Sequence, residues 1–119
     1  MRKIIFKNQM HAKKFHDFCE ALPEQKQIPA GYAVAYLLAL IGEHENDIFD
    51  FQKGILKPDV SNAVWQTGST KRATTLLYTL WNEYSALSEK ANIFDIFGYS
   101  EWDRYFLEAI RIRYIQTIG

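Results

Sequence analysis

The most informative stretch of the sequence is PAGYAVAYLLALIG, residues Pro29 to Gly42. It contains the longest apolar run of the chain, Ala33–Ile41, and this run of nine residues is too short to cross a bilayer. The stretch predicts a helix that is apolar nearly all round, and in a soluble protein such a helix must be covered by its neighbours. We therefore expect it at the middle of the core.

On the N-terminal side, an amphipathic helix is expected to begin after Asn8, whose side chain suits a helix N-cap, and to end near Pro23. Apolar positions recur there at helical spacing, at His11, Phe15, Phe18, Cys19 and Leu22. The other face carries charged residues, which we expect to be solvated. Ahead of this helix, Lys3–Phe6 fits a short strand but is too short to decide alone.

On the C-terminal side, a helix capped by Ser69 or Thr70 is expected. Its apolar stripe is Ala73, Leu76, Leu77, Leu80, Trp81 and Tyr84. A short helical turn over Ile93–Phe97 should stop at Gly98, because glycine readily takes the left-handed conformation that ends helices.

A last helix is expected to be capped by Ser100. Acidic Glu101 and Asp103 fall in its first turn and basic Arg111 and Arg113 in its last, which complements the helix dipole. Its apolar positions are Trp102, Tyr105, Phe106, Ala109, Ile110 and Ile112.

The segment Glu43–Gly68 is the least regular part of the chain because turn-forming residues interrupt it. We expect a helical turn near Ile48–Phe51, a turn at Lys53-Gly54, and extended pieces around Ile55–Leu56 and Ala63–Trp65. Long irregular segments of this kind often carry function.

Length and composition indicate one domain over residues 1–119, with 48% hydrophobic residues and few prolines and glycines. The expected fold class is mainly α, a compact bundle of four main helices with short irregular or extended segments and a minor β component. A single cysteine cannot form an internal disulfide, and the N-terminus lacks a secretory apolar segment. We therefore expect a cytoplasmic protein that does not enter a membrane.

The formal net charge is zero, with 14 basic and 14 acidic residues, which disfavours bulk nucleic-acid binding. The charges are segregated all the same: Met1–Gln27 and Lys53–Arg72 have a basic excess, whereas Glu43–Asp50 is acidic. Local charged patches are therefore compatible with the neutral total.

No pattern indicates a catalytic or metal centre. His16 and Cys19 lie three residues apart on the first helix, but a tetrahedral site needs three or four ligands, and Cys19 falls on the apolar face where thiols are usually inert. The acidic residues Glu43, Glu45, Asp47 and Asp50 fit neither an EF-hand loop nor a helical carboxylate site. We expect a solvated acidic loop, no metal, no cofactor and no catalytic residue.

The most suggestive segment is WQTGSTKR, Trp65 to Arg72. A glycine and two hydroxyl side chains at a helix start, followed by two cations, are features that a phosphate or carboxylate site requires. The full phosphate-binding loop pattern is absent, because no second glycine occurs five positions before Gly68. Ordinary capping followed by solvated cations is the competing interpretation. The candidate partner- or anion-binding residues are Trp65, Gly68, Ser69, Thr70, Lys71 and Arg72.

Three parts of the chain carry a resemblance: Asp50–Asp59, the Trp65–Arg72 segment with Leu80-Trp81-Asn82, and the ending from Asp95-Ile96-Phe97-Gly98 to Ile110–Tyr114. Together they resemble an uncharacterised, domain-of-unknown-function family of small bacterial proteins. Many of its members belong to phages and other mobile elements of Gram-positive bacteria. The resemblance spans about Phe6–Tyr114 and includes no catalytic motif. It implies a stand-alone accessory protein of a mobile element, a setting where small non-enzymatic proteins often bind a host or defence component.

Two functions follow as hypotheses. The first is a non-enzymatic protein-binding module, because the chain is rich in Trp and Tyr, residues that often anchor interfaces. The second is a small nucleotide or nucleic-acid binder that uses Gly68–Arg72 together with Lys53 and Lys57. An exposed aromatic patch around Trp65 would favour the first, and salt-dependent binding would favour the second.

Overall fold

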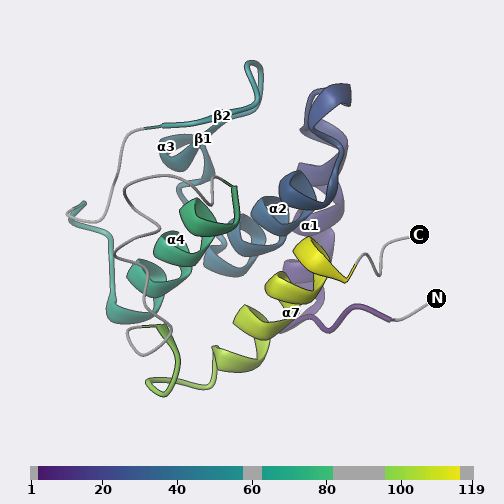
Figure 1. Cartoon of the computed structure of the whole chain (residues 1–119). Helices are drawn as coiled ribbons and strands as arrows, with labels where there is room; N and C mark the ends of the chain where they lie inside the picture. Colours follow the sequence, from purple (N-terminus) through teal and green to yellow (C-terminus); the bar gives the residue numbers. More distant parts are fainter. Residues whose placement is uncertain (1–2, 58–62, 82–95, 116–119) are drawn as a thin grey trace.

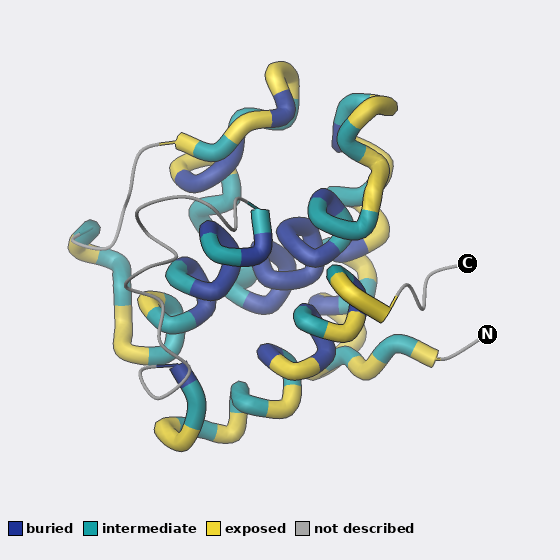
Figure 2. Tube along the Cα trace, in the orientation of Figure 1, coloured by how far each residue is buried: buried dark blue, intermediate teal, exposed yellow. Residues whose placement is uncertain are grey.

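The helix expected from Pro29 lies at the centre of the molecule as α2 (Pro29–Ile41) in a computed structural model that describes residues 3–57, 63–81 and 96–115 (Figure 1). Every residue from 33 to 40 is buried, which confirms that α2 is the core element (Figure 2). The helix ends where Gly42 adopts a φ of 84°, a left-handed conformation that favours glycine.

The first amphipathic helix is α1 (Gln9–Ala21), packed against α2. The Asn8 side chain accepts a hydrogen bond from the His11 backbone N–H at 2.8 Å, as expected of an N-cap. His11, Phe15 and Leu22 are buried. A single 3₁₀ turn, η1 (Glu24–Lys26), connects α1 to α2.

The two C-terminal helices, α4 (Gly68–Trp81) and α7 (Asp103–Tyr114), also pack against α2. Their apolar stripes face it, so that Leu77, Phe106 and Ala109 are fully enclosed. Both helices contact α2 more extensively than they contact each other. The main-helix assignment is therefore confirmed, and the expected stripe residue Tyr84 lies outside the described residues.

The starts of these two helices correct the sequence-based expectation. Thr67, rather than Ser69 or Thr70, caps α4: its Oγ1 accepts the Thr70 N–H at 3.2 Å. Ser100 holds the turn before α7 by accepting the Trp102 N–H, and the helix itself begins at Asp103, so Glu101 precedes it.

Between α2 and α4 lie α3 (Glu45–Ile48), β1 (Phe49–Asp50) and β2 (Ile55–Leu56). The strands form an antiparallel pair in which Phe49 is opposite Leu56, closed by a turn at Gly54 with a φ of 67°. The turn at Lys53-Gly54 and the extended Ile55–Leu56 are confirmed. The helical turn lies earlier than expected because β1 already occupies Phe49 and Asp50.

Two other expected extended pieces are wrong. Ala63–Trp65 ends in a turn, and Lys3–Phe6 forms neither a strand nor a helix. Gly98 has the expected left-handed φ, at 92°, whereas residues 93–95 of the helical turn expected before it lie outside the described residues. In the described ranges, no helix combines the length and the apolar character that a membrane crossing requires.

Candidate functional site

The α4 N-terminus, where the sequence placed an anion or partner site, is already capped by the protein itself. Thr67 and Thr70 bond reciprocally: the Thr70 N–H donates to Thr67 Oγ1 at 3.2 Å, and the Thr67 N–H donates to Thr70 Oγ1 at 2.7 Å. This arrangement is a capping box made of two threonines. Gly68 and Ser69 follow as the first helical residues.

The two cations of this segment differ in environment. Lys71 is exposed, whereas Arg72 is half-buried and folds back along the helix. The Arg72 guanidinium carbon lies 4.7 Å from the centre of the Tyr99 ring, and Nη2 lies 3.4 Å from Ser69 Oγ. A Cβ atom added to Gly68 would lie 3.3 Å from Nη1 of this arginine. Arg72 is thus packed on an aromatic ring.

Trp65 lies in a different environment from Arg72. Its ring stacks on the imidazole of His44 at a centroid distance of 4.4 Å and an angle of 9°, and the indole packs partly buried against the core. The six residues that the sequence grouped therefore face two different surroundings: Trp65 meets the α2–α3 connection, and Arg72 meets Tyr99.

The acidic residues of the α2–α3 region do not converge on one point. Glu43 and Asp47 lie 3.5 Å and 3.3 Å from the ring nitrogens of His44. Asp50 instead accepts the backbone N–H groups of Gln52 and Lys53 in the β1–β2 turn. Within residues 3–57, 63–81 and 96–115, no group of three or more His, Cys, Asp or Glu side chains is arranged to hold a metal ion.

Cys19 is a free thiol packed against the core. Burial, assisted by the charge of Glu20, raises the pKa of this thiol to about 12. A thiol of this kind carries almost no thiolate at neutral pH and is a poor nucleophile.

A cluster of buried polar groups holds the segment ahead of α1 against α2 and α7. His11 Nε2 lies 3.0 Å from the Tyr36 carbonyl oxygen, and the Lys7 N–H donates to His11 Nδ1 at 3.0 Å. The Tyr36 hydroxyl donates to the Ile5 carbonyl, and the Ile5 N–H donates to the carboxylate of Glu108, which is 1% exposed. These bonds satisfy polar groups inside the core.

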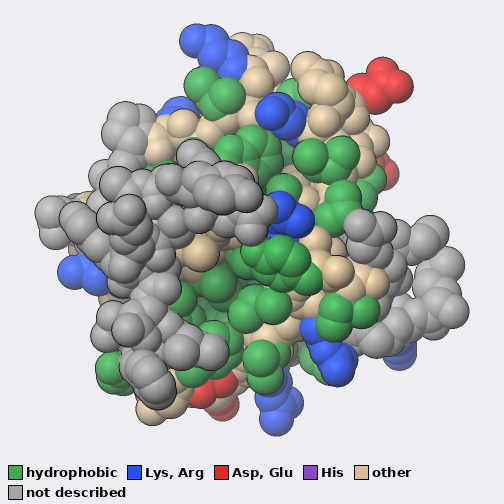
Figure 3. All heavy atoms as spheres, viewed as in Figure 1, with side chains coloured by type: hydrophobic (Ala, Val, Ile, Leu, Met, Phe, Trp, Pro, Cys, Tyr) green, Lys and Arg blue, Asp and Glu red, His purple; other side chains and the backbone are tan. Residues whose placement is uncertain are grey.

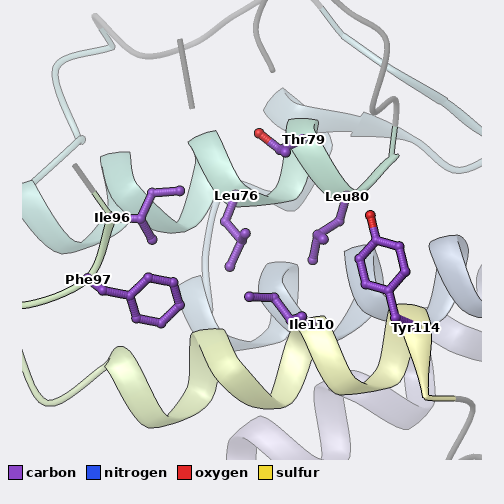
Figure 4. A pocket seen from close by; sticks show the side chains of 7 residues that line it. All are labelled: Leu76, Thr79, Leu80, Ile96, Phe97, Ile110 and Tyr114. Atoms are coloured by element: carbon purple, nitrogen blue, oxygen red, sulfur yellow. The ribbon is translucent and has the colours of Figure 1, made fainter. Parts of the chain in front are cut away.

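An apolar groove lies between α4 and α7 and is open to solvent (Figure 4). Its volume is about 210 Å³, and it is lined by Leu76, Thr79, Leu80, Ile96, Phe97, Ile110 and Tyr114. Figure 3 shows hydrophobic side chains gathered over this part of the molecule, with Lys and Arg side chains beside them. Sequence reasoning missed this groove.

The α7 helix contributes Ile110 and Tyr114 to the groove, and these residues belong to a second apolar face of the helix. Phe106, Ala109 and Ile112 face the core, whereas Leu107, Ile110 and Tyr114 follow one another at helical spacing on an adjoining side. Leu107 is 54% exposed and Tyr114 is 52% exposed. The spacing of these three residues was the available sequence signal for the outer face of the helix.

Comparison with known proteins gives one family. A family model described as a family of unknown function, DUF6075, matches residues 1–118. The chain belongs to this family. No curated protein and no solved structure is significantly similar to the chain. Membership of DUF6075 thus covers nearly the whole chain, including every residue of the groove and of the α4 N-terminus.

Proposed function

We propose that this DUF6075 protein is a small, non-enzymatic protein-binding module. The observation that carries the proposal is the apolar surface at the α4–α7 groove, an open hollow with mostly hydrophobic walls whose lining includes half-exposed Tyr114. Apolar surface that stays open beside polar rims is typical of interaction sites.

We further propose that the module is an accessory protein of a phage or mobile element, located in the cytoplasm, where it acts on a host or defence protein. This part rests on the resemblance carried by Asp50–Asp59, Trp65–Arg72 and the C-terminal segment. In such a role the protein needs to bind its target and needs no catalytic activity.

The alternative is a nucleotide or nucleic-acid binder at Gly68–Arg72. Two contacts weigh against it. Thr67 Oγ1 already takes the Thr70 N–H that an anion would use, and the Arg72 guanidinium is packed over Tyr99. Of the two cations in Gly68–Arg72, Lys71 is therefore the one whose side chain remains exposed.

The experiment is affinity capture from an extract of the native Gram-positive host, with and without nuclease treatment, followed by mass spectrometry. We expect one host protein, recovered in comparable molar amount to the bait and insensitive to nuclease. The double variant Lys71→Glu, Arg72→Glu should recover the same protein. Recovery of nucleic acid alone, lost in the double variant, would instead establish the alternative.

A further inference from the structure

We infer that the segment ahead of α1, residues 4–7, is released from the helices when His11 is protonated, while α1, α2 and α7 stay folded. We call residues 4–7 the N-terminal segment. The inference is independent of the proposed function and makes this segment a conformational device that responds to acid. Three features support it: the bonds that hold the segment, the protonation state that these bonds require of His11, and the small apolar surface that the segment buries.

Side chains from three helices bind the backbone of the N-terminal segment. The Lys7 N–H donates to His11 Nδ1 of α1 at 3.0 Å, and the Ile5 N–H donates to the carboxylate of Glu108 of α7 at 2.8 Å. The Ile5 carbonyl accepts a hydrogen bond from the Tyr36 hydroxyl of α2. None of these three bonds is a backbone bond of a helix, so their loss leaves the hydrogen bonds within the helices intact.

His11 holds the N-terminal segment only in its neutral form. Nδ1 accepts the Lys7 N–H and therefore carries no proton, so the ring proton lies on Nε2, which is 3.0 Å from the Tyr36 carbonyl oxygen. With both nitrogens engaged, a second proton can enter only at Nδ1. It would then face the Lys7 N–H, and a contact between two donors would replace the hydrogen bond.

The imidazole of His11 is enclosed by aromatic rings and is 2% exposed. The ring centre of Phe6, in the N-terminal segment, lies 5.2 Å away, that of Tyr36 on α2 lies 4.5 Å away, and that of Tyr105 on α7 lies 6.1 Å away. A charged imidazole in this position loses its contact with water. Departure of the N-terminal segment, and of Phe6 with it, would return one side of the ring to solvent.

The charged groups of this region also favour neutral His11. Burial and the charge of Lys7 together lower the pKa of His11 to about 4. The Lys7 ammonium lies 5.0 Å from the centre of the Trp102 ring, and the Glu108 carboxylate of α7 already accepts a hydrogen bond from the segment. On α1 itself, His16 is exposed. Protonation of His11 is therefore easier in the released state than in the bound state.

The N-terminal segment buries less apolar surface than the helices do. Ile4 and Phe6 are half-buried, whereas Ile5 and Lys7 are exposed. The Phe6 ring packs on Phe15 at a centroid distance of 5.5 Å, but every residue from 33 to 40 of α2 is buried. Segments with few buried contacts open at a lower free energy than the core. Release of residues 4–7 is thus expected before global unfolding.

Amide hydrogen exchange of the intact protein at pH 7.5 and pH 4.5 tests the inference. The protection factor of each amide is its exchange rate in an unstructured peptide divided by its rate in the protein, which removes the intrinsic effect of pH. The released imidazole returns toward its ordinary pKa of 6.5, so acid favours the released state. We expect the protection factors of the Ile5 and Lys7 amides to fall at least about tenfold and at most about 70-fold at pH 4.5.

Urea separates local release from global unfolding. Low urea should accelerate exchange of the Leu37 amide in α2 but not exchange of Ile5 and Lys7, because local opening exposes little new surface. Protection factors of Ile5 and Lys7 that do not change with pH would overturn the inference. Protection and urea dependence equal to those of Leu37 would also overturn it, because the segment would then open only with the whole protein.

Two matched variants assign the effect to His11. Glutamine does not titrate, so His11→Gln should give the same Ile5 protection factor at both pH values, whereas His16→Gln should follow the wild type. A pH dependence that persists in His11→Gln would overturn the inference, since it would belong to another group such as Glu108.

A third variant keeps the test decisive even if His11→Gln does not fold. Phe6→Ala removes the ring that packs on Phe15 and should lower the Ile5 and Lys7 protection factors at least about tenfold at pH 7.5. The Leu37 amide should stay far better protected in this variant. Loss of Leu37 protection to the same level as Ile5 would contradict local release.

Discussion

Acidification should destabilise this protein through His11, the imidazole buried at the start of α1. Burial lowers the pKa of His11 to about 4 from its ordinary value of 6.5. The Tyr36 carbonyl opposes this effect through its hydrogen bond, and the nearby charge of Lys7 adds to it. Because the Lys7 N–H donates to Nδ1, a proton placed on Nδ1 would also break that bond.

The sign and size of the effect of pH on stability follow from the difference between the pKa of His11 in the folded and unfolded states. The pKa in the folded state lies below that of the unfolded state, so the unfolded chain binds the proton more tightly. The free energy of unfolding is therefore unaffected by His11 above about pH 6.5, falls as the pH drops, and levels off below about pH 4. A shift from 6.5 to about 4 corresponds to at most about 3 kcal/mol, against a total of roughly 6 to 18 kcal/mol for a chain of this length.

Urea denaturation between about pH 7.5 and pH 4 measures this effect. We expect the wild type to lose up to about 3 kcal/mol more than His11→Gln over this range, because glutamine does not titrate. His16→Gln removes an exposed histidine from the same helix and should follow the wild type. Equal pH profiles for the wild type and His11→Gln would refute the argument.

Three further predictions concern the core, the thiol and the helix start. Leu77→Ala, at a residue with no exposed surface, should lower the free energy of unfolding by about 2 to 5 kcal/mol in the same urea assay, and a loss below about 1 kcal/mol would contradict its core position. Cys19→Ser should fold with a modest loss in the free energy of unfolding. The native Cys19 thiol should react slowly with a disulfide reagent, and rapid labelling of this thiol at neutral pH would contradict its raised pKa. Lys71→Glu should leave the melting temperature nearly unchanged, whereas Arg72→Glu should lower it by removing the contact with Tyr99, and equal melting of both variants would contradict this packing.

The helices were predictable from the sequence because their signals are local. The apolar run in Pro29–Ile41, the Asn8 cap and the stripes of α4 and α7 depend on residues within a few turns of each other. The start of α4 was misplaced by two or three residues because Thr67, Ser69 and Thr70 are all good caps. The reciprocal bonds of Thr67 and Thr70 decide among them.

The site was less predictable because it depends on tertiary packing. Local features correctly indicated hydroxyl groups and cations at a helix start, but not that Arg72 would pack on Tyr99. The groove forms because α4 and α7 both pack against α2. No local sequence pattern encodes this tertiary arrangement. The burial of Glu108 depends in the same way on Ile5, its hydrogen-bond partner 103 positions earlier in the chain.

The central claim, protein binding through the α4–α7 groove, is tested most directly by capture from host extract with wild-type and Tyr114→Glu baits side by side. We predict that the wild-type bait captures one nuclease-insensitive host protein in a molar amount comparable to its own, and that Tyr114→Glu captures at least about tenfold less. The control Met10→Glu, which introduces the same charge at a residue of α1 that is 58% exposed, should capture as much as the wild type. A wild-type bait that retains no host protein, or a Tyr114→Glu bait that retains it in full, would contradict the claim.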